Sequence, residues 1–306
     1  DCMMKTLLIT GSNGLLGQKL VYAALERKNI RLIATAKGNN RLIQQEGYVY
    51  EEMDITDSEA VQRIIAKYKP DCVIHAAAMT NVDACEIQKE DCLKQNVHAV
   101  EYLVQACNQN KSHLIHISTD FIFDGKGGPY KEEDTPNPVS YYGWSKLEAE
   151  RIVQSSSQDW AILRTILVFG IVDHMSRSNV VLWAKSALEK GQEINVVSDQ
   201  FRMPTLAEDL AEACLLAFEK HARGIFHISG KDYMSIVELV QRVADYYHLD
   251  KSIIRPVNSE TLNQTARRPP RTGFHLEKSM QTLGYAPHSF EEGLAILDRQ
   301  IAASKG

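Results

Sequence analysis

The chain has no apolar run long enough to cross a membrane. A membrane-spanning helix needs about 20 predominantly apolar residues, and no apolar segment among these 306 residues approaches that length. The first such segment, residues 6–10 (Thr-Leu-Leu-Ile-Thr), is short and typical of a buried strand. We therefore expect no membrane partner, no signal peptide and a cytoplasmic location.

Paired cysteines and an excess of positive charge are also missing. The 6 cysteines include no CxxC pair, and Cys72 and Cys107 lie within apolar patterns, so we expect reduced core thiols and no metal site. The formal net charge of −5 offers no basic field for a nucleic-acid backbone. Nucleic acid is therefore not an expected partner.

A glycine-rich turn lies between the first apolar run and a helical pattern. Residues 11–17 read Gly-Ser-Asn-Gly-Leu-Leu-Gly, and apolar side chains then recur at helical spacing up to residue 25. Glycines allow the backbone to approach a pyrophosphate closely, and the free N–H groups of a helix start attract its charge. We interpret this turn as a dinucleotide-binding loop, the alternative being a plain glycine-rich turn.

Six strand patterns alternate with helical ones in the first part of the chain. They lie at residues 6–10, 31–35, 48–55, 72–78, 113–118 and 160–165. This alternation predicts an α/β, Rossmann-type, doubly wound parallel sheet in residues 1–168. Elements are shorter beyond that point, so residues 169–306 are predicted to form mainly a smaller α/β substrate-binding lobe, with some later segments returning to the first domain.

The end of the second predicted strand carries no carboxylate. In a dinucleotide fold this position meets the adenosine ribose, and an acidic residue there bonds the 2′-hydroxyl. Lys37 follows instead, with Arg41 close by, which suits a ribose 2′-phosphate. The sequence therefore favours NADPH, with NADH as the alternative cofactor, although exposed loop charges would give the same pattern.

Tyr142 and Lys146 are four residues apart at the start of a predicted helix that Ser140 would cap. This spacing places the phenol and the ammonium on one helical face. A neighbouring Lys together with a cofactor cation would bring the pKa of the phenol towards neutrality. We therefore expect an acid–base pair, although an ordinary exposed helix start would show the same spacing.

Arg267 and Arg268 precede two prolines late in this acidic chain. Prolines forbid a regular element there and stiffen the loop. Guanidinium groups pair with phosphate oxygens in a fixed fork, so we expect this loop to contact the diphosphate of a nucleotide sugar. The alternative is a surface loop whose arginines are solvated or bound to acidic residues of the same chain.

Taken together, the motifs resemble those of the extended short-chain dehydrogenase/reductases. Ser118, Thr119 and Asp120 end the fifth predicted strand, ahead of the Tyr142–Lys146 pair. Within that superfamily, residues 76–83, 118–125 and 199–205 are most similar to those of the dTDP-4-dehydrorhamnose reductases. The likeness covers nearly the whole chain.

The resemblance implies NAD(P)H-dependent reduction of a 4-keto group on a nucleotide-linked deoxysugar. Tyr142 would donate the proton, Thr119 would hydrogen-bond the substrate carbonyl, and Lys146 would hold the nicotinamide ribose. The residues implied in cofactor binding are Gly11, Asn13, Gly14, Leu15, Leu16, Gly17, Lys37, Asp54, Ile55, Ala76, Ala77, Ala78, Thr80, Ser118, Tyr142 and Lys146. Those expected to bind the nucleotide sugar are Thr119, Asp120, Leu167, Arg202, Arg267 and Arg268.

Two positions depart from the patterns of these relatives. Leu167 stands where the rhamnose reductases usually carry a stacking Trp, which leaves the identity of the sugar open. Phe121 stands where the sugar-nucleotide dehydratases place a Glu, which disfavours dehydration.

A nucleotide-sugar epimerase remains an alternative. So does a non-catalytic, dinucleotide-binding subunit similar to the regulatory subunit of methionine adenosyltransferase, which would bind a partner protein; a homodimer is a further expectation.

Lys37→Ala is expected to narrow a preference for NADPH over NADH, because the ammonium would pair with the 2′-phosphate. Fluorescence titration with each cofactor measures the two dissociation constants. Equal affinities in the unmodified protein would show that Lys37 and Arg41 are only solvated loop charges.

Overall fold

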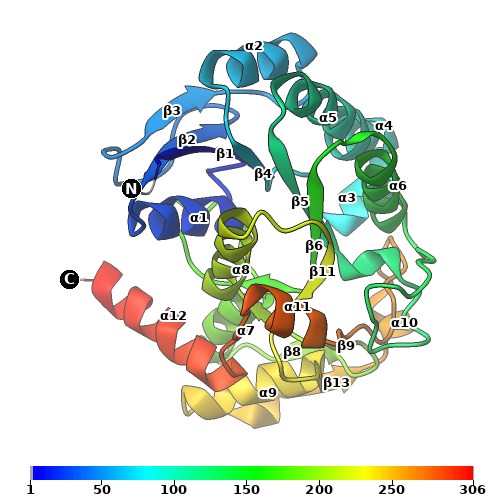
Figure 1. Cartoon of the computed structure of the whole chain (residues 1–306). Helices are drawn as coiled ribbons and strands as arrows, with labels where there is room; N and C mark the ends of the chain where they lie inside the picture. Colours follow the sequence, from blue (N-terminus) through cyan, green and yellow to red (C-terminus); the bar gives the residue numbers. More distant parts are fainter. Residues whose placement is uncertain (1–2, 306) are drawn as a thin grey trace.

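The structure, a computed structural model, describes residues 3–305. Its centre is a seven-stranded sheet with the strand order β11-β6-β5-β4-β1-β2-β3, and every neighbouring pair in it is parallel (Figure 1). The strands are β1 (Lys5–Thr10), β2 (Ile30–Ala36), β3 (Val49–Glu52), β4 (Cys72–His75), β5 (His113–Thr119), β6 (Trp160–Thr165) and β11 (Gly224–Ile228). The predicted doubly wound α/β fold is confirmed.

Helices cover both faces of this sheet. On one face lie α1 (Leu15–Leu25) and α8 (Ala207–Glu219), and on the other lie α2 (Ser58–Tyr68), α5 (Ala99–Asn110) and α6 (Tyr141–Ser156). Leu7 and Ile9 of β1 pack towards α1 and α8, whereas Leu8 packs towards α2, α5 and α6. Burial on both faces explains why the strand sequence is apolar throughout and does not alternate.

Two predicted elements are shorter or more irregular than expected. The third strand ends at Glu52, because the Asp54 side chain accepts from the backbone N–H of Thr56 (2.9 Å) and turns the chain. The helical pattern of residues 92–109 is interrupted: it begins in α4 (Lys89–Leu93), passes through a π-helical turn (Lys94–His98) and continues as α5, and a separate α3 (Val82–Ile87) precedes it. Local side-chain hydrogen bonds of this kind are poorly visible in a hydrophobic pattern.

The late part of the chain contributes an edge strand to the main sheet. β11 pairs with β6 from Gly224 opposite Ala161 to Ile228 opposite Thr165. The following segment includes α11 (Glu277–Leu283), which lies beside β11 and α8. A boundary drawn at residue 168 therefore describes this chain only if the returning segments are counted with the first domain.

A second hydrophobic core lies at one end of the sheet (Figure 1). Its buried side chains come from β7 (Val168–Phe169), α7 (Val180–Glu189), β8 (Ile194–Val197), β10 (Thr205–Leu206), β12 (Met234–Ser235), α9 (Ile236–Tyr246), β13 (Ile254–Val257) and α12 (Phe290–Ser304). Three short elements, β9 (Phe201–Arg202), the 3-10 turn η3 (Lys251–Ile253) and α10 (Ser259–Leu262), lie beside β12, α9 and β8. Phe169, Val181, Leu239 and Leu294 are almost fully buried in this core. The chain that leaves the main sheet after β6 packs against this core.

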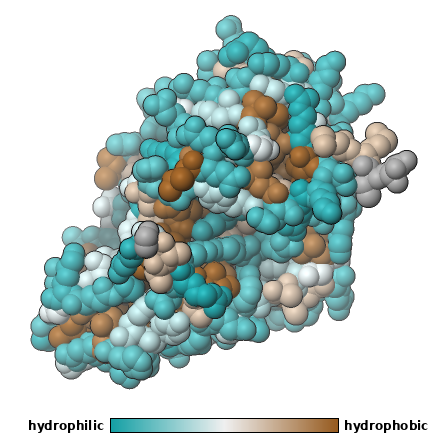
Figure 2. All heavy atoms as spheres, turned by 90° about the vertical axis from the view of Figure 1, so that its left-hand side faces the viewer, coloured by the Kyte–Doolittle hydropathy of each residue, from teal (hydrophilic) through white to brown (hydrophobic). Residues whose placement is uncertain are grey.

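Hydrophilic residues predominate on the face shown in Figure 2, where hydrophobic residues form small, separated patches. Among residues 3–305, no helix combines the length and apolar character needed to span a bilayer. Cys72, Cys85, Cys92, Cys107 and Cys214 are buried free thiols, as the sequence led us to expect. Cys2 lies outside the described residues.

A buried ion pair joins α6 to the sheet. The Arg164 guanidinium on β6 bonds the Glu150 carboxylate on α6 (Nη2–Oε1 2.7 Å, Nε–Oε2 3.1 Å), and both side chains are almost completely buried. The hydroxyl of Ser118 donates to Glu150 Oε2 (2.5 Å), and Arg164 Nη1 donates to the carbonyl of Glu132 (3.3 Å). Because several polar partners surround it, the pair satisfies the condition under which buried charges are tolerated.

Arg164→Met is expected to lower the free energy of unfolding by about 3–5 kcal/mol, because it leaves the Glu150 carboxylate buried without its cation. The matched control is Arg151→Met on α6, next to Glu150, which removes an arginine that is 62% exposed and paired with Glu148. That change should cost less than about 1 kcal/mol. Urea denaturation measures both values, and equal losses in the two variants would contradict the assignment.

Candidate active site

A cavity of about 570 Å³ opens where the order of the strands reverses. β2 and β3 lie on one side of β1, and β4, β5, β6 and β11 lie on the other, so the crossovers leave in opposite directions from β1 and β4. In open parallel sheets, ligands bind in this crevice at the carboxyl ends of the strands. The sequence-predicted residues that line the cavity are Gly11, Asn13, Gly14, Leu15, Leu16, Gly17, Ala76, Ala77, Ala78, Thr80, Ser118, Thr119, Asp120, Tyr142, Lys146, Leu167 and Arg202.

The glycine loop is too tightly packed to accept side chains. A Cβ on Gly17 would lie 1.9 Å from the carbonyl oxygen of Gly11, and one on Gly11, whose φ is +68°, would lie 2.8 Å from the backbone of Ala77. The first turn of α1 has no side-chain cap, so its free N–H groups remain available to an anion. The loop therefore fits the diphosphate of a dinucleotide.

The start of α6 sets the position of Tyr142 and Lys146. The Ser140 hydroxyl accepts from the backbone N–H of Gly143 (3.1 Å), which confirms the predicted cap. Glu86 Oε1 accepts from the N–H of Tyr141 (2.7 Å), so two side chains satisfy the first turn. Tyr142 and Lys146 are both buried, 8% and 4% exposed, and both line the cavity.

Burial shifts both groups towards their neutral forms. Desolvation raises the pKa of Tyr142 well above its usual value, and a hydrogen bond with Thr119 offsets this only in part. Desolvation also lowers the pKa of Lys146 to about 8, against the opposing field of Glu150. The ammonium donates to the carbonyl of Ile117 (2.9 Å). The lowering of the Tyr142 pKa expected from the sequence is therefore not produced by the protein groups alone, because desolvation outweighs them.

Thr119 and Asp120 form a polar corner beside the phenol. The Thr119 hydroxyl donates to Asp120 Oδ1 (3.1 Å), and the Thr272 hydroxyl donates to Asp120 Oδ2 (2.5 Å). Burial raises the pKa of Asp120, with the nearby Arg202 acting against the shift, and burial lowers the pKa of Arg202. This corner can hydrogen-bond hydroxyl or carbonyl groups of a ligand next to Tyr142.

Ser118 lines the cavity, but its hydroxyl already donates to the buried Glu150. Its side chain therefore connects the cavity wall to the buried ion pair of Glu150 and Arg164. Leu167 also lines the cavity and has a φ of +40°, a backbone conformation that branched or bulky side chains rarely adopt. Leu167 thus forms part of the cavity wall at the position where the rhamnose reductases usually carry a stacking Trp.

Lys37, Asp54 and Ile55 lie outside the cavity lining, beyond the outer strands. Lys37 is 82% exposed, and its Nζ is 4.0 Å from Asp54 Oδ2. Glu52 Oε1 accepts from the N–H of Gly38 (3.2 Å). Glu52 at the end of β3 and Asp54 just after it therefore place two carboxylates beside the loop that follows β2. The sequence showed no acidic residue at the end of β2 itself. The roles of Lys37, Asp54 and Ile55 towards a cofactor remain predictions.

Arg267 and Arg268 are also outside the cavity lining. Arg268 bonds both carboxylate oxygens of Asp83 (Nη1–Oδ1 3.1 Å, Nη2–Oδ2 3.1 Å), and the N–H of Ala266 donates to the same Asp83 (2.9 Å). This is the acidic partner on the same chain that the sequence left as the alternative for this loop. Contact of either arginine with a diphosphate remains a prediction.

Sequence reasoning missed one whole wall of the cavity. Residues 172 and 175–180, between β7 and α7, line it opposite the glycine loop. Arg177 reaches across and donates from Nη1 to the Thr80 hydroxyl (2.7 Å). The polar run Ser-Arg-Ser-Asn at 176–179, directly before a helix, was the available signal.

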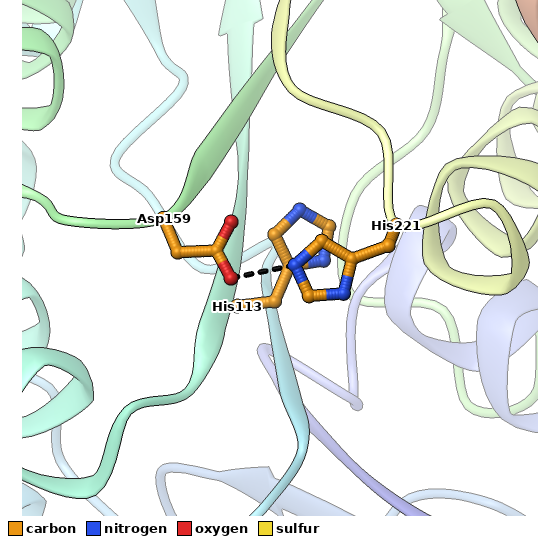
Figure 3. Close-up of side chains that lie close together, drawn as sticks. All are labelled: His113, Asp159 and His221. Atoms are coloured by element: carbon orange, nitrogen blue, oxygen red, sulfur yellow. Dashed lines mark hydrogen bonds and ion pairs between the residues drawn. The ribbon is translucent and has the colours of Figure 1, made fainter.

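A second polar cluster lies at the opposite, amino-terminal edge of the sheet (Figure 3). His113, Asp159 and His221 bring one potential ligand atom each within 4.8 Å of one another. The His113 Nε2 already contacts the carbonyl of Ala222 (2.7 Å), and its ring stacks on that of His221 with centroids 4.2 Å apart. Arg223 Nε donates to Asp159 Oδ1 (2.9 Å). His221 Nε2 also contacts Asp159 Oδ2 (2.6 Å), so the members of the cluster bond one another and their neighbours, and we assign them to holding together the amino-terminal ends of β5, β6 and β11.

Known proteins match this chain along nearly its whole length. The family model described as the RmlD substrate binding domain matches residues 4–301. The methionine adenosyltransferase 2 subunit beta of Danio rerio is 32% identical over 299 residues, which cover 96% of this chain and 90% of that protein. The dTDP-4-dehydrorhamnose reductase of Aggregatibacter actinomycetemcomitans is 31% identical over 304 residues, covering 95% and 97%. The solved dTDP-4-dehydrorhamnose reductase of Bacillus anthracis, in complex with NADP, is 26% identical with a TM-score of 0.83, covering 97% and 100%.

The lowered pKa of Lys146 predicts how stability depends on pH. Between the folded value of about 8 and the ordinary value of 10.5, the unfolded chain binds a proton at this site that the folded chain does not. The free energy of unfolding should therefore rise with pH across this window and lose that gain as pH falls through 8. Relative to Lys146→Met, the parent should gain roughly 3 kcal/mol. Denaturation curves at several pH values test this, and parallel pH profiles for the two proteins would contradict it.

Proposed function

Because the chain belongs to the RmlD substrate binding domain family, we propose that it uses NADPH to reduce a 4-keto group on a nucleotide-linked deoxysugar. The observation that carries this proposal is the meeting of three groups in one cavity. The Tyr142 phenol, the Thr119 hydroxyl and the Lys146 ammonium line the same space as the glycine loop. A carbonyl reduction needs a proton donor, a hydrogen-bond donor for the carbonyl oxygen and a cation in this arrangement.

The Tyr142 phenol is in the protonation state that a proton donor needs. At neutral pH the phenol is protonated, so it can give its proton to the oxygen of a ketone as the carbonyl carbon is reduced. The cofactor supplies the hydride for that carbon when it is bound. Thr119 and the Lys146 ammonium, which line the same cavity as the phenol, then stabilise the tyrosinate that remains. Burial strengthens these interactions because the local dielectric is low.

The cofactor assignment is supported by a relative and by the shape of the loop. The reductase of Bacillus anthracis that shares this fold was solved with NADP. In the present chain, residues 11–17 and the start of α1 would hold the diphosphate, and Lys146 would hold the nicotinamide ribose. We propose NADPH as the preferred cofactor, with NADH as the alternative, and we keep the cytoplasmic location and the homodimer as expectations.

A second candidate function is binding of a partner protein. It is favoured by the similarity to the methionine adenosyltransferase 2 subunit beta, which is as high as the similarity to the reductases. The two proposals differ in what they require of the cavity. A binding subunit would need only the dinucleotide site, whereas a reductase also needs Thr119, Tyr142 and Lys146.

A panel of dTDP-4-keto sugars tests the reductase proposal. The loss of NADPH absorbance in the presence of one of these sugars, with formation of the hydroxyl product, would support it. If no sugar in the panel is reduced and the protein co-purifies stoichiometrically with a partner chain, the binding function is the better account. An epimerase would instead interconvert a sugar pair without net consumption of NADPH.

Tyr142→Phe is expected to reduce turnover by about 10²–10⁴-fold, the usual effect of removing a general acid, and to leave the dissociation constant of NADPH unchanged. Steady-state kinetics and fluorescence titration measure the two quantities separately. Tyr141→Phe, at the half-buried neighbour on the same helical turn, is the matched control. Unchanged turnover in Tyr142→Phe would remove this residue from the reaction.

A further inference from the structure

The segment between β7 and α7 forms a strap across the cofactor side of the cavity. Residues 172 and 175–179 line the same cavity as the glycine loop, although they connect β7 and α7 of the second core. At one end of the strap, Arg177 bonds Thr80 (2.7 Å). At the other end, Asp173 and His174 bond α1 and the loop that follows β2. The strap therefore spans the groove from one wall to the other.

Asp173 is held by a set of specific hydrogen bonds. The buried Gln18 donates from Nε2 to the carbonyl of Asp173 (2.9 Å) and accepts from its N–H at Oε1 (2.9 Å), and the same amide donates to the carbonyl of Asn13 (3.0 Å). The Asp173 carboxylate accepts from the Tyr22 hydroxyl and from the backbone N–H of Ile43 (3.1 Å). Burial, followed by this hydrogen bond, raises the pKa of Tyr22 to about 12, so the phenol remains a donor.

These bonds act on the loop of residues 37–43, which we call the selecting loop because it carries Lys37 and Arg41. His174 Nδ1 contacts the carbonyl of Arg41 (3.0 Å). From the other side, Asn13 accepts from the N–H of Arg41 (2.8 Å) and donates to the carbonyl of Asn39 (2.8 Å). The backbone of the selecting loop is thus fixed between the glycine loop and the strap, while the side chains of Lys37 and Arg41 remain exposed.

We propose that Asp173 is a positioning residue for cofactor selection: by holding Ile43 and Tyr22, it sets the selecting loop where it can meet a ribose 2′-phosphate. This inference rests on the proposed NADPH-dependent function. It adds a role in cofactor selection for a residue of the predicted substrate-binding lobe, residues 169–306. A loop released from Asp173 would still allow the diphosphate to bind at residues 11–17. It would lose contacts made specifically with the 2′-phosphate, because ordering the loop would then oppose binding.

The test compares cofactor affinities in Asp173→Ala, with Asp134→Ala as the matched control. Asp134 also accepts a backbone N–H in a turn, from Lys131 (2.8 Å), but lies outside the cavity lining. In Asp173→Ala the dissociation constant of NADPH should rise about tenfold, equivalent to ~1.4 kcal/mol, and that of NADH less than about threefold. Asp134→Ala should change neither. A merely structural defect would weaken both cofactors equally and would overturn the proposal.

Two further variants keep the test decisive if Asp173→Ala does not fold. Asp173→Asn keeps an oxygen that can accept from Tyr22 and Ile43, so its ratio of NADH to NADPH dissociation constants should stay close to that of the parent. Tyr22→Phe removes only the hydroxyl and should lower the ratio about threefold. An unchanged ratio in Tyr22→Phe, or a ratio in Asp173→Asn as low as that expected for Asp173→Ala, would overturn the inference.

Hydrogen exchange separates this inference from the proposed function. Without any cofactor, amides of residues 37–43 should exchange faster in Tyr22→Phe and in Asp173→Ala than in the parent, and not in Asp134→Ala. Unchanged exchange would show that Asp173 does not hold the loop. If exchange is faster but the parent binds neither NADPH nor NADH, the positional contact stands, whereas the proposed function and the role in cofactor selection both fail.

Discussion

The reversal of strand order between β1 and β4 is the constraint on which the rest of the structure depends. All seven strands of the main sheet are parallel, so their carboxyl ends share one edge, and the reversal opens that edge into a crevice. The glycine loop must enter the crevice with almost no side-chain volume, because a Cβ on Gly11 or Gly17 would lie less than 3 Å from backbone atoms. The apolar strands, the uncapped start of α1 and the small residues after β4 all follow from that geometry.

Burial is the second physical factor in the site. Tyr142 and Lys146 are held almost free of solvent, and desolvation moves the pKa of each towards the neutral form. The neutral phenol is the form that can donate a proton, but its raised pKa makes it a weaker acid, and a bound cofactor cation would have to offset that effect. Behind Lys146, the Glu150 carboxylate, held in place by Arg164, provides a negative charge that opposes deprotonation of the ammonium. The site and the fold therefore share one polar network.

The sequence predicted the features that depend on neighbours along the chain. The glycine loop and the pairing of Tyr142 with Lys146 require only a strand-to-helix turn and a four-residue spacing. Contacts between distant residues were not predictable from one sequence. The bonding of Arg268 to Asp83 joins residues far apart in the chain, and the bonds of Asp173 to α1 do the same. The pKa of Tyr142 was expected to fall because burial, a tertiary property, could not be read from the spacing.

Transfer of deuterium from NADPH that carries deuterium at both hydrogen positions on C4 of the nicotinamide is the most direct test of the central claim. The protein would be incubated with this cofactor and a dTDP-4-keto-6-deoxy sugar, and the product would be analysed by mass spectrometry and NMR. The account predicts one deuterium on C4 of the sugar and a new hydroxyl at the same carbon, with transfer almost absent in Tyr142→Phe. Product without deuterium, or equal transfer by the variant, would contradict it.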